Sequence, residues 1–256
     1  MRTNTITAST LTRGLLTVAV AAVLTAAVQP ATAAALGDGG WKGEGGLTLD
    51  ASDNSKVDAY VDRAREAERS ISTDVRTAAL ASGAELVGFD HRLKSPDSLK
   101  RKVATSLKEQ PQQDIETALA RLSDAVRYTL QWPDDTYTHG VTTASTLLSA
   151  WGNDSTKWSN TWGRTAGYKG LNTSWRASGS GQLFEVQFHT PASKHAQELT
   201  HRLYEEQRLP ATSPARKKEL QAQQDSVFAA VSVPAGADGL TAPTRPTAPM
   251  PVSAVR

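Results

Sequence analysis

Residues 171–190 read LNTSWRASGSGQLFEVQFHT and contain two runs of β-forming residues on either side of a Gly- and Ser-rich centre. Residues 171–175 and 183–188 are therefore predicted to pair as a β-hairpin, with its turn at residues 178–181. The second strand alternates, so its apolar side chains fall on one face and its polar ones on the other. That polar face carries Glu185, Gln187 and His189.

Helix signals surround this hairpin on both sides. Apolar residues recur at spacings of three and four from residue 57 to residue 79, which predicts one or two amphipathic helices ending before Gly83. Further helices are predicted at residues 96–108, 112–122, 141–151, 191–208 and 215–231, and further strands at residues 84–89, 125–132 and 157–162. This order predicts an α+β fold in which a mixed β-sheet is flanked by helices.

The two ends of the chain differ in composition from its centre. Residues 1–35 combine a basic start, an apolar run of moderate length and an A-x-A site, the pattern of a secretory signal peptide; an ordinary N-terminal helix is the alternative. Residues 36–50 are expected to be a flexible leader, and residues 51–231 to form the folded domain. The Pro-, Ala- and Thr-rich residues 232–256 are expected to be a disordered tail. We therefore expect a secreted monomer without a membrane span.

Composition excludes some classes of site. The chain has no cysteine, so it has no disulfides, thiolate metal sites or cysteine nucleophiles. The formal net charge is only +2, so a site for a polyanion requires a local cluster of basic residues.

Such a cluster lies in residues 91–102, HRLKSPDSLKRK, where the Ser-Pro pair favours the start of a helix. Arg92 and Lys94 would project on the same side of an extended segment. Ser98 and Lys102 would share one face of the helix. This arrangement suits a polyphosphate at a helix N-terminus, and a solvated basic surface is the alternative.

Three further patterns are candidates for chemistry. Asp124 and Arg127 lie at the start of a predicted buried strand. Asp124 could hold a divalent cation, and Arg127 could contact phosphate or stack on a base; a salt bridge at the end of the strand is the alternative. Tyr168 lies between glycines in GYKG, where it could stack on a base or plug a turn. Glu185 could be a general base and a metal ligand, or part of an outward polar face.

In their order along the chain, these motifs resemble a known family. The motifs are R-x-K-S-P-x-S-L-x-R-K, D-A-V-R, G-Y-K-G-L-N and E-V-Q-F-H-T, followed by H-x-L-Y-E at residues 201–205. Together they resemble the synthetase domain of RelA/SpoT-like proteins, over residues 84–208. With the predicted signal peptide, the chain resembles in particular the secreted ATP:nucleotide 3′-pyrophosphokinases of actinobacteria. The resemblance implies a fold related to the nucleotidyltransferases.

The resemblance also implies an activity and a donor site. The activity is transfer of the β,γ-pyrophosphate of ATP to the 3′-hydroxyl of a purine nucleotide, with Mg²⁺ as cofactor, AMP as the second product and no hydrolase activity. Arg92 and Arg127 would stack on the adenine of ATP. Lys94, Ser98 and Lys102 would bind its phosphates.

Metal and base roles are implied for three residues. Asp124 and Glu185 would hold Mg²⁺, Glu185 would also activate the 3′-hydroxyl, and Gln187 would position it. The family acid usually stands five residues before the arginine, where this chain has Leu122. Asp124 stands three residues before Arg127, a shift of two that keeps the same face of an extended strand.

Acceptor binding is implied for five residues, Tyr168, Arg164, Asn172, His189 and His201. Tyr168 would stack on the acceptor base. Asn172 replaces the usual His, and His189 replaces an Arg, so the choice between adenine and guanine acceptors stays open. Two other hypotheses are a secreted module that binds nucleic acid or another polyanion, and a toxin of the same fold that makes (p)ppApp.

Overall fold

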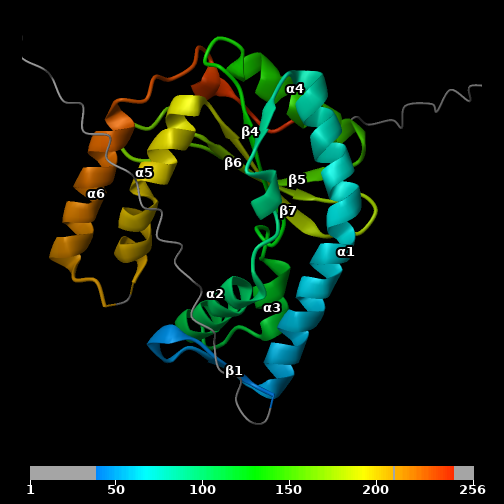
Figure 1. Cartoon of the computed structure of the whole chain (residues 1–256), viewed down its shortest axis with the longest axis vertical. Coiled ribbons are helices and arrows are strands. Elements are labelled where there is room, and N and C mark those ends of the chain that lie inside the picture. Colours follow the sequence, from blue (N-terminus) through cyan, green and yellow to red (C-terminus); the bar gives the residue numbers. More distant parts are fainter. Residues whose placement is uncertain (1–38, 210, 245–256) are drawn as a thin grey trace, which may run out of the picture. The chain divides into compact units, whose positions relative to one another are not determined.

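The structure is a computed structural model that describes residues 39–209 and 211–244. Its centre is a five-stranded sheet in the order β3-β4-β7-β6-β5 (Figure 1). Only β4 and β7 run parallel; the other neighbours are antiparallel. The strands span Glu85–Val87 (β3), Arg127–Gln131 (β4), Asp154–Asn160 (β5), Leu171–Arg176 (β6) and Leu183–His189 (β7). The mixed sheet with flanking helices confirms the predicted α+β class, and the β6–β7 pair confirms the predicted hairpin.

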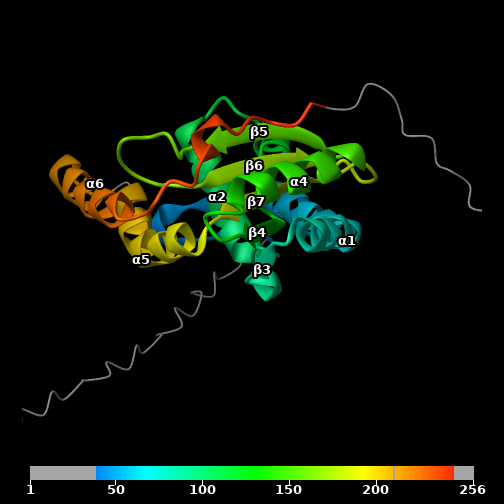
Figure 2. The same cartoon turned by 90° about the horizontal axis from the view of Figure 1, so that it is seen from above.

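Helices lie on both faces of this sheet. Figure 2 shows α1 and α4 on one side and the adjacent pair α5 and α6 on the other. The helices are Ala51–Ser82 (α1), Pro96–Glu109 (α2), Ile115–Ala120 (α3), Tyr137–Ala150 (α4), Pro191–Arg208 (α5) and Pro214–Ala229 (α6). Short 3₁₀ turns occupy Glu44–Gly46, Phe89–His91 and Ala237–Gly239. Among the described residues, no helix combines the length and hydropathy that a membrane span requires.

The first helix is a single element of 32 residues. Asp50 caps its start, because its carboxylate accepts a hydrogen bond from the backbone N–H of Asp53 at 2.8 Å. Gly83 ends it in the left-handed region at φ 69°, which a residue without Cβ adopts at little cost. No Gly or Pro interrupts the helix between these points, so the predicted one or two helices form one.

Aromatic side chains fill the core between the sheet and α4. The Tyr137 hydroxyl donates to the carbonyl of Phe188 at 3.0 Å, and the indole N–H of Trp162 donates to that hydroxyl at 2.8 Å. Trp132 packs edge-on against Tyr137 and donates to the carbonyl of Ser82 at 2.9 Å. These aromatic side chains thus pack in the core with their polar atoms hydrogen-bonded, in a protein that has no disulfides.

The folded part extends beyond the predicted limits of 51 and 231. Residues 39–50 contain a small sheet of β1 (Trp41–Lys42) and β2 (Thr48–Leu49), which adds Trp41 and Leu49 to the core. Residues 232–244 lie beside β5 (Figure 2) and add the buried Ala237. The predictions of a flexible leader and a disordered tail are therefore corrected for these residues. The predicted signal peptide and the end of the predicted tail lie outside the described residues.

Candidate functional site

One face of the sheet is polar at its centre. Residues paired in neighbouring strands point to the same face, and the register aligns Arg127 of β4 with Glu185 of β7. Gln187, two residues further along β7, is paired with Asn172 of β6. The opposite face of β7 carries buried apolar residues toward α1 and α4. The alternation read from the sequence is therefore present, and it gathers three of the motifs on one face.

The basic segment joins this face by backbone pairing. The N–H of Lys94 donates to the carbonyl of Ala125 at 3.0 Å, and the N–H of Arg127 donates to the carbonyl of Arg92 at 2.8 Å. These bonds flank an isolated antiparallel bridge between Leu93 and Val126. The residues before α2 thus continue the edge of the sheet along β4, which brings the first two motifs together.

Asp124 lies between two lysines of the basic cluster. Its carboxylate accepts from Lys94 Nζ at 2.6 Å and from Lys102 Nζ at 2.7 Å. Burial by itself would raise the pKa of Asp124, but the two ammonium groups outweigh it and lower the pKa to about 2. The carboxylate is therefore ionised at neutral pH. In this structure it neutralises much of the charge expected to meet phosphates.

Glu185 is a half-buried carboxylate that is held by an amide. Gln187 Nε2 donates to Glu185 Oε1 at 2.6 Å. The pKa of Glu185 is raised, first by burial and then by the negative charge of Asp124, while Arg127 acts in the opposite direction. A carboxylate with a raised pKa is a better proton acceptor at neutral pH than an exposed one.

Helix α5 closes one side of this polar face with further polar groups. Lys194 Nζ donates to Gln197 Oε1 at 2.9 Å, and Gln197 Nε2 reaches Gln187 Oε1 at 3.5 Å. Burial, the first cause, and the charge of Arg127 lower the pKa of Lys194, while its ion pair with Glu198 at 3.5 Å acts in the opposite direction. Lys194 thus places a second source of positive charge across the face from the basic segment. The sequence motifs do not include Lys194, which lies within the predicted helix 191–208.

The start of α2 is capped from within the chain. Ser95 Oγ accepts from the N–H of Ser98 at 3.3 Å, and its hydroxyl also donates to Ser98 Oγ at 2.9 Å. The predicted Ser-Pro helix start is confirmed. However, this cap uses the backbone N–H of Ser98, so that N–H is already paired and does not add to the predicted polyphosphate site. Of the backbone N–H and the hydroxyl of Ser98, the hydroxyl is the one that stays a candidate phosphate ligand.

Tyr168, Asn172 and His189, three of the acceptor-side candidates, form a compact network that continues the polar face. The Tyr168 hydroxyl donates to Asn172 Oδ1 at 2.8 Å and lies 3.0 Å from His189 Nε2. His189 is fully buried, its Nδ1 lies 2.7 Å from Ser193 Oγ, and burial lowers its pKa to about 3. His189 is therefore a neutral group that supports Tyr168. Its burial does not fit the expected direct contact with an acceptor.

Two predicted acceptor residues lie at the surface. Arg164 is exposed in the segment between β5 and β6, where its carbonyl accepts a hydrogen bond from Lys169. His201 is exposed on α5, on the same helical face as Gln197 one turn earlier. The structure places neither side chain in the Tyr168 network.

Arg92 is the most constrained of the predicted donor-site residues. Its Nε donates to Glu68 of α1 at 2.5 Å, and its Nη1 donates to the carbonyl of Phe89 at 3.2 Å. The guanidinium carbon lies 4.2 Å from the centre of the Phe89 ring. Glu68 was missed in the sequence, although its spacing of four from Ala64 and three from Ile71 places it on the buried face of α1.

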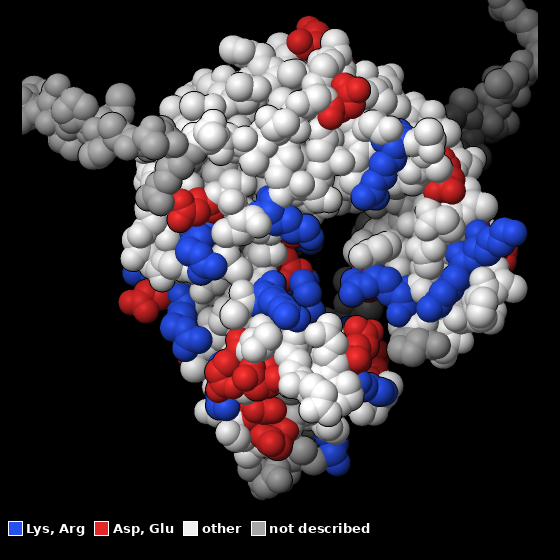
Figure 3. Space-filling view, turned by 180° about the vertical axis from the view of Figure 1, so that it is seen from behind, with Lys and Arg blue, Asp and Glu red and all other residues white. Residues whose placement is uncertain are grey.

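The surface over this region is hollowed and mixed in charge. Figure 3, seen from behind, shows a hollow between the α5–α6 pair on the right and the helices below it. Lys and Arg atoms line both sides of the hollow, and acidic atoms lie among those on its left wall. The shape and charge suit a ligand that carries several negative charges and reaches buried acidic groups.

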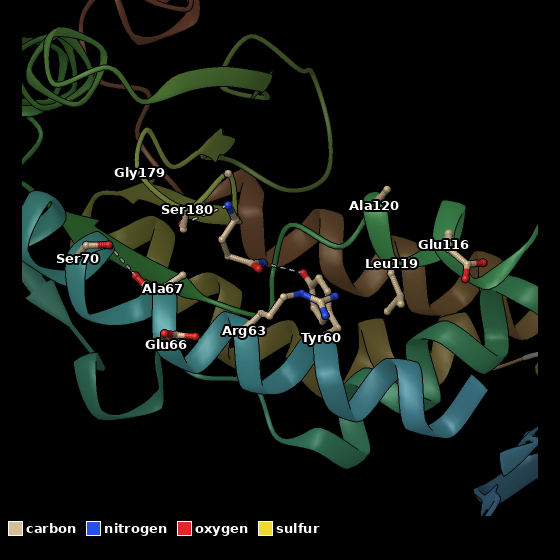
Figure 4. Close-up of a pocket in the computed structure, with 12 residues that line it drawn as sticks. Tyr60, Arg63, Glu66, Ala67, Ser70, Glu116, Leu119, Ala120, Gly179 and Ser180 are labelled. Carbon is tan, nitrogen blue, oxygen red and sulfur yellow. Dashed lines mark hydrogen bonds between the residues drawn. The ribbon is translucent and has the colours of Figure 1, made fainter. Parts of the chain in front are cut away.

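A second cavity, of about 650 Å³, lies elsewhere, along α1 (Figure 4). Residues of α1, of α3 and of the turn at 179–182 line it. At its wall the Tyr60 hydroxyl donates to the carbonyl of Leu122 at 2.7 Å and accepts from Gln182 at 3.0 Å. None of the predicted site residues lines this cavity, so it is separate from the polar face.

Comparison with known proteins gives a fold likeness only. No family model matches the chain, and no curated protein does. Small alarmone synthetase 1 from Bacillus subtilis, solved bound to its product pppGpp, is 15% identical, with a TM-score of 0.47, covering 68% of this chain and 92% of that one. A GTP pyrophosphokinase family protein from Streptococcus pneumoniae is 15% identical, with a TM-score of 0.45, covering 71% and 90%. These similarities are weak and do not by themselves assign a function to this chain.

Proposed function

We propose that this protein is a RelA/SpoT-like pyrophosphokinase that transfers the β,γ-pyrophosphate of ATP to the 3′-hydroxyl of a purine nucleotide and releases AMP. The observation that supports this most is the convergence of four separate motifs. Segments around Lys94, Asp124, Tyr168 and Glu185 meet along one polar face, although the chain between them forms several helices and strands. A basic segment, two acids and an aromatic ring are the groups that such a transfer requires.

In the proposed reaction, the 3′-oxygen of the acceptor attacks the β-phosphorus of ATP. A bond forms between that oxygen and Pβ, and the bond from Pβ to the oxygen shared with Pα breaks. The bridging oxygen leaves with AMP, and the proton of the 3′-hydroxyl passes to Glu185. Gln187 holds the Glu185 carboxylate at 2.6 Å, which fixes the orientation of the base.

The lysines of the basic segment would bind the phosphates of ATP. In the structure, Lys94 and Lys102 are both paired with Asp124. A polyphosphate carries more negative charge than one carboxylate, so it competes for both ammonium groups. Lys194, across the face on α5, would add charge on the acceptor side.

The donor set fits Mg²⁺, which prefers oxygen ligands and is often held by one or two carboxylates together with substrate phosphates. Asp124 and Glu185 would supply such carboxylates, and the charge of Asp124 is near enough to raise the pKa of Glu185. Among the described residues no cluster of three metal-ligating side chains occurs, so substrate oxygens would complete the shell. When bound, the ion would neutralise charge on the phosphates.

Acceptor recognition would centre on Tyr168. Its ring is half-buried, and its hydroxyl is fixed by Asn172 and His189, so the ring is set to stack on a base. His189 would act through Tyr168. The roles of Arg164 and His201, the monomeric state and secretion remain predictions from the sequence. A module that only binds polyanions is less well supported, because Asp124 already pairs with two of the basic residues.

The test is incubation of the purified protein with labelled ATP, Mg²⁺ and AMP, ADP, GDP or GTP. We expect AMP and a 3′-pyrophosphorylated product in equal amounts with at least one acceptor. Glu185→Gln removes the base and should reduce turnover by at least about a hundredfold. Glu109→Gln, at an exposed residue at the end of α2, is the matched control and should behave like the wild type. Intact ATP under all conditions, or near wild-type turnover of Glu185→Gln, would refute the proposal.

A further inference from the structure

We propose that Glu68 and Phe89 are positioning residues that hold the Arg92 guanidinium as a flat platform for the purine base of the donor nucleotide. The inference rests on the proposed function and adds to it two residues that none of the motifs contains. Glu68 comes from α1 and Phe89 from the 3₁₀ turn before the basic segment.

The guanidinium is fixed on one face and along its edge. Phe89 packs against the face, with the guanidinium carbon 4.2 Å from the ring centre. The edge donates from Nε to Glu68 at 2.5 Å and from Nη1 to the carbonyl of Phe89 at 3.2 Å. A stacked and hydrogen-bonded guanidinium has lost most of its freedom, so little further ordering is required when a ligand binds.

This arrangement favours a base over a phosphate as the ligand of Arg92. An arginine binds phosphate through its N–H edge, and here Glu68 and the Phe89 carbonyl occupy much of that edge. The ion pair with Glu68 also offsets the positive charge. The side chain keeps 25% of its surface exposed, which offers a planar face to a second ring. Lys94 and Lys102 follow Arg92 in the chain and would bind the phosphates of the same nucleotide.

Glu68 is itself held rigidly. It is only 6% exposed, and the same carboxylate oxygen that meets Arg92 accepts a hydrogen bond from Ser72 one turn later. The Ser72 hydroxyl lies 2.9 Å from the Tyr128 hydroxyl of β4. A buried carboxylate needs such partners, and their presence fixes its position relative to the sheet. The platform is therefore tied both to α1 and to the strand that carries Arg127.

The test separates base binding from phosphate binding. Glu68→Gln removes the charge, Phe89→Leu removes the ring, and Glu66→Gln changes an exposed acid on the same helix as the control. Steady-state kinetics give KM for ATP and for the acceptor, and inhibition by tripolyphosphate probes the phosphate site alone. Calorimetric titration with ATP and with tripolyphosphate compares the affinity for a ligand with a base and for one without, and it does not require turnover.

We expect Glu68→Gln and Phe89→Leu to weaken the binding of ATP about tenfold. This is the effect expected when one stacking or charge-assisted contact is lost. The kcat, the acceptor KM and tripolyphosphate binding should stay within about twofold of the wild type, because the platform touches none of the reacting atoms. KM does not depend on the fraction of folded enzyme, so partial unfolding would not imitate this pattern.

Unchanged ATP affinity in both variants, or an equal loss for ATP and tripolyphosphate, would overturn the inference. So would a fall in kcat at unchanged KM. A wild-type protein that binds ATP but transfers no pyrophosphate would refute the proposed function alone. In that case the calorimetric comparison of Glu68→Gln with Glu66→Gln still decides the role of Glu68.

Discussion

The environments of Asp124 and Glu185 shift their pKa values in opposite directions. Two ammonium groups keep Asp124 ionised, with a pKa of about 2, although burial opposes them. Burial, strengthened by the charge of Asp124, raises the pKa of Glu185. Neighbouring acids shifted apart in this way divide the roles of a site, one as a permanent anion and one as a proton acceptor.

The raised pKa of Glu185 predicts the pH dependence of the reaction. The base must be deprotonated, so kcat/KM should rise with pH through the pKa of Glu185. That midpoint should lie above the ordinary glutamate value of about 4.3. The measurement is a pH–rate profile of pyrophosphate transfer at saturating Mg²⁺. A rate that stays constant down to pH of about 4 would contradict the role of Glu185 as base.

Asp124 should also contribute to stability in a pH-dependent way. Its folded pKa of about 2 lies below the unfolded value of about 3.9, so its contribution is present above about pH 4 and is lost as pH falls toward 2. Asp124→Asn should lower the free energy of unfolding by about 2 kcal/mol at pH 7, and by progressively less below pH of about 4. Urea unfolding of both proteins across this range is the measurement. A difference that grows on acidification would contradict the ion pairs.

Local sequence signals predicted some helix starts and the β-hairpin correctly, but they misplaced the start of another helix. The Ser-Pro start of α2 and the hairpin of β6 and β7 follow from residues that act on their own backbone. By contrast, α4 begins at Tyr137, four residues before the predicted start, and its N-cap makes no side-chain hydrogen bond. Tertiary packing of Tyr137 against Trp132 and Trp162 fixes that turn, which no local pattern reveals.

The contact of α4 with Trp132, the residue that follows β4, gives a test of this packing. A Cβ on Gly140 would lie 2.2 Å from Trp132 Nε1, and that buried indole is held by its bond to the Ser82 carbonyl. Gly→Ala in a free helix stabilises by about 1 kcal/mol. Here overpacking should reverse the sign, so that Gly140→Ala destabilises the protein by about 2 kcal/mol.

Thermal and urea unfolding would measure the effect of Gly140→Ala. Thr142→Ala is the control, because Thr142 is exposed on the same helix and makes only an intrahelical hydrogen bond. A Gly140→Ala protein that is more stable than the wild type would show that α4 does not approach Trp132 as closely as described.

For the whole molecule, the predicted limits of the fold were too narrow. Residues 232–244 are rich in Pro, Gly and Ala, a composition that is typical of a disordered tail. Their backbone carbonyls nevertheless accept side-chain donors from the domain, namely Trp158 to Leu240 at 3.0 Å and Thr138 to Ala235 at 2.7 Å. Because backbone acceptors carry no sequence signal, composition alone could not reveal this contact. Residues 232–244 also lie beside β5, one of the two edge strands of the sheet.

Removing this segment should therefore destabilise the domain. A chain ending at Val231 loses these hydrogen bonds and that of Asn160 to Ala237 at 2.8 Å, at about 1 kcal/mol each. We expect its free energy of unfolding to fall by about 3 kcal/mol. A chain ending at Thr244 keeps every contact named here and is the control. Equal urea midpoints for the two truncated chains would contradict the packing of residues 232–244.

The candidate site was predictable where its residues lie within motifs. Asp124, Tyr168 and Glu185 come from motifs that could be read along the chain, and the structure gathers those segments. Glu68 and Lys194 could not be assigned a role, because each lies on a helix whose contact with the site depends on the tertiary fold. The burial of His189 could not be predicted either, because the alternation of a strand does not show which of its polar side chains a helix will cover.

Pyrophosphate transfer is tested most directly by following the β-phosphorus of ATP. ATP labelled at that atom is incubated with Mg²⁺, an acceptor nucleotide and the protein, and the products are separated. We expect the label to move to the acceptor together with the γ-phosphate, and one unlabelled AMP to form per labelled product. Label recovered in ADP, or left in unreacted ATP with every purine nucleotide tried, would contradict the proposed transfer.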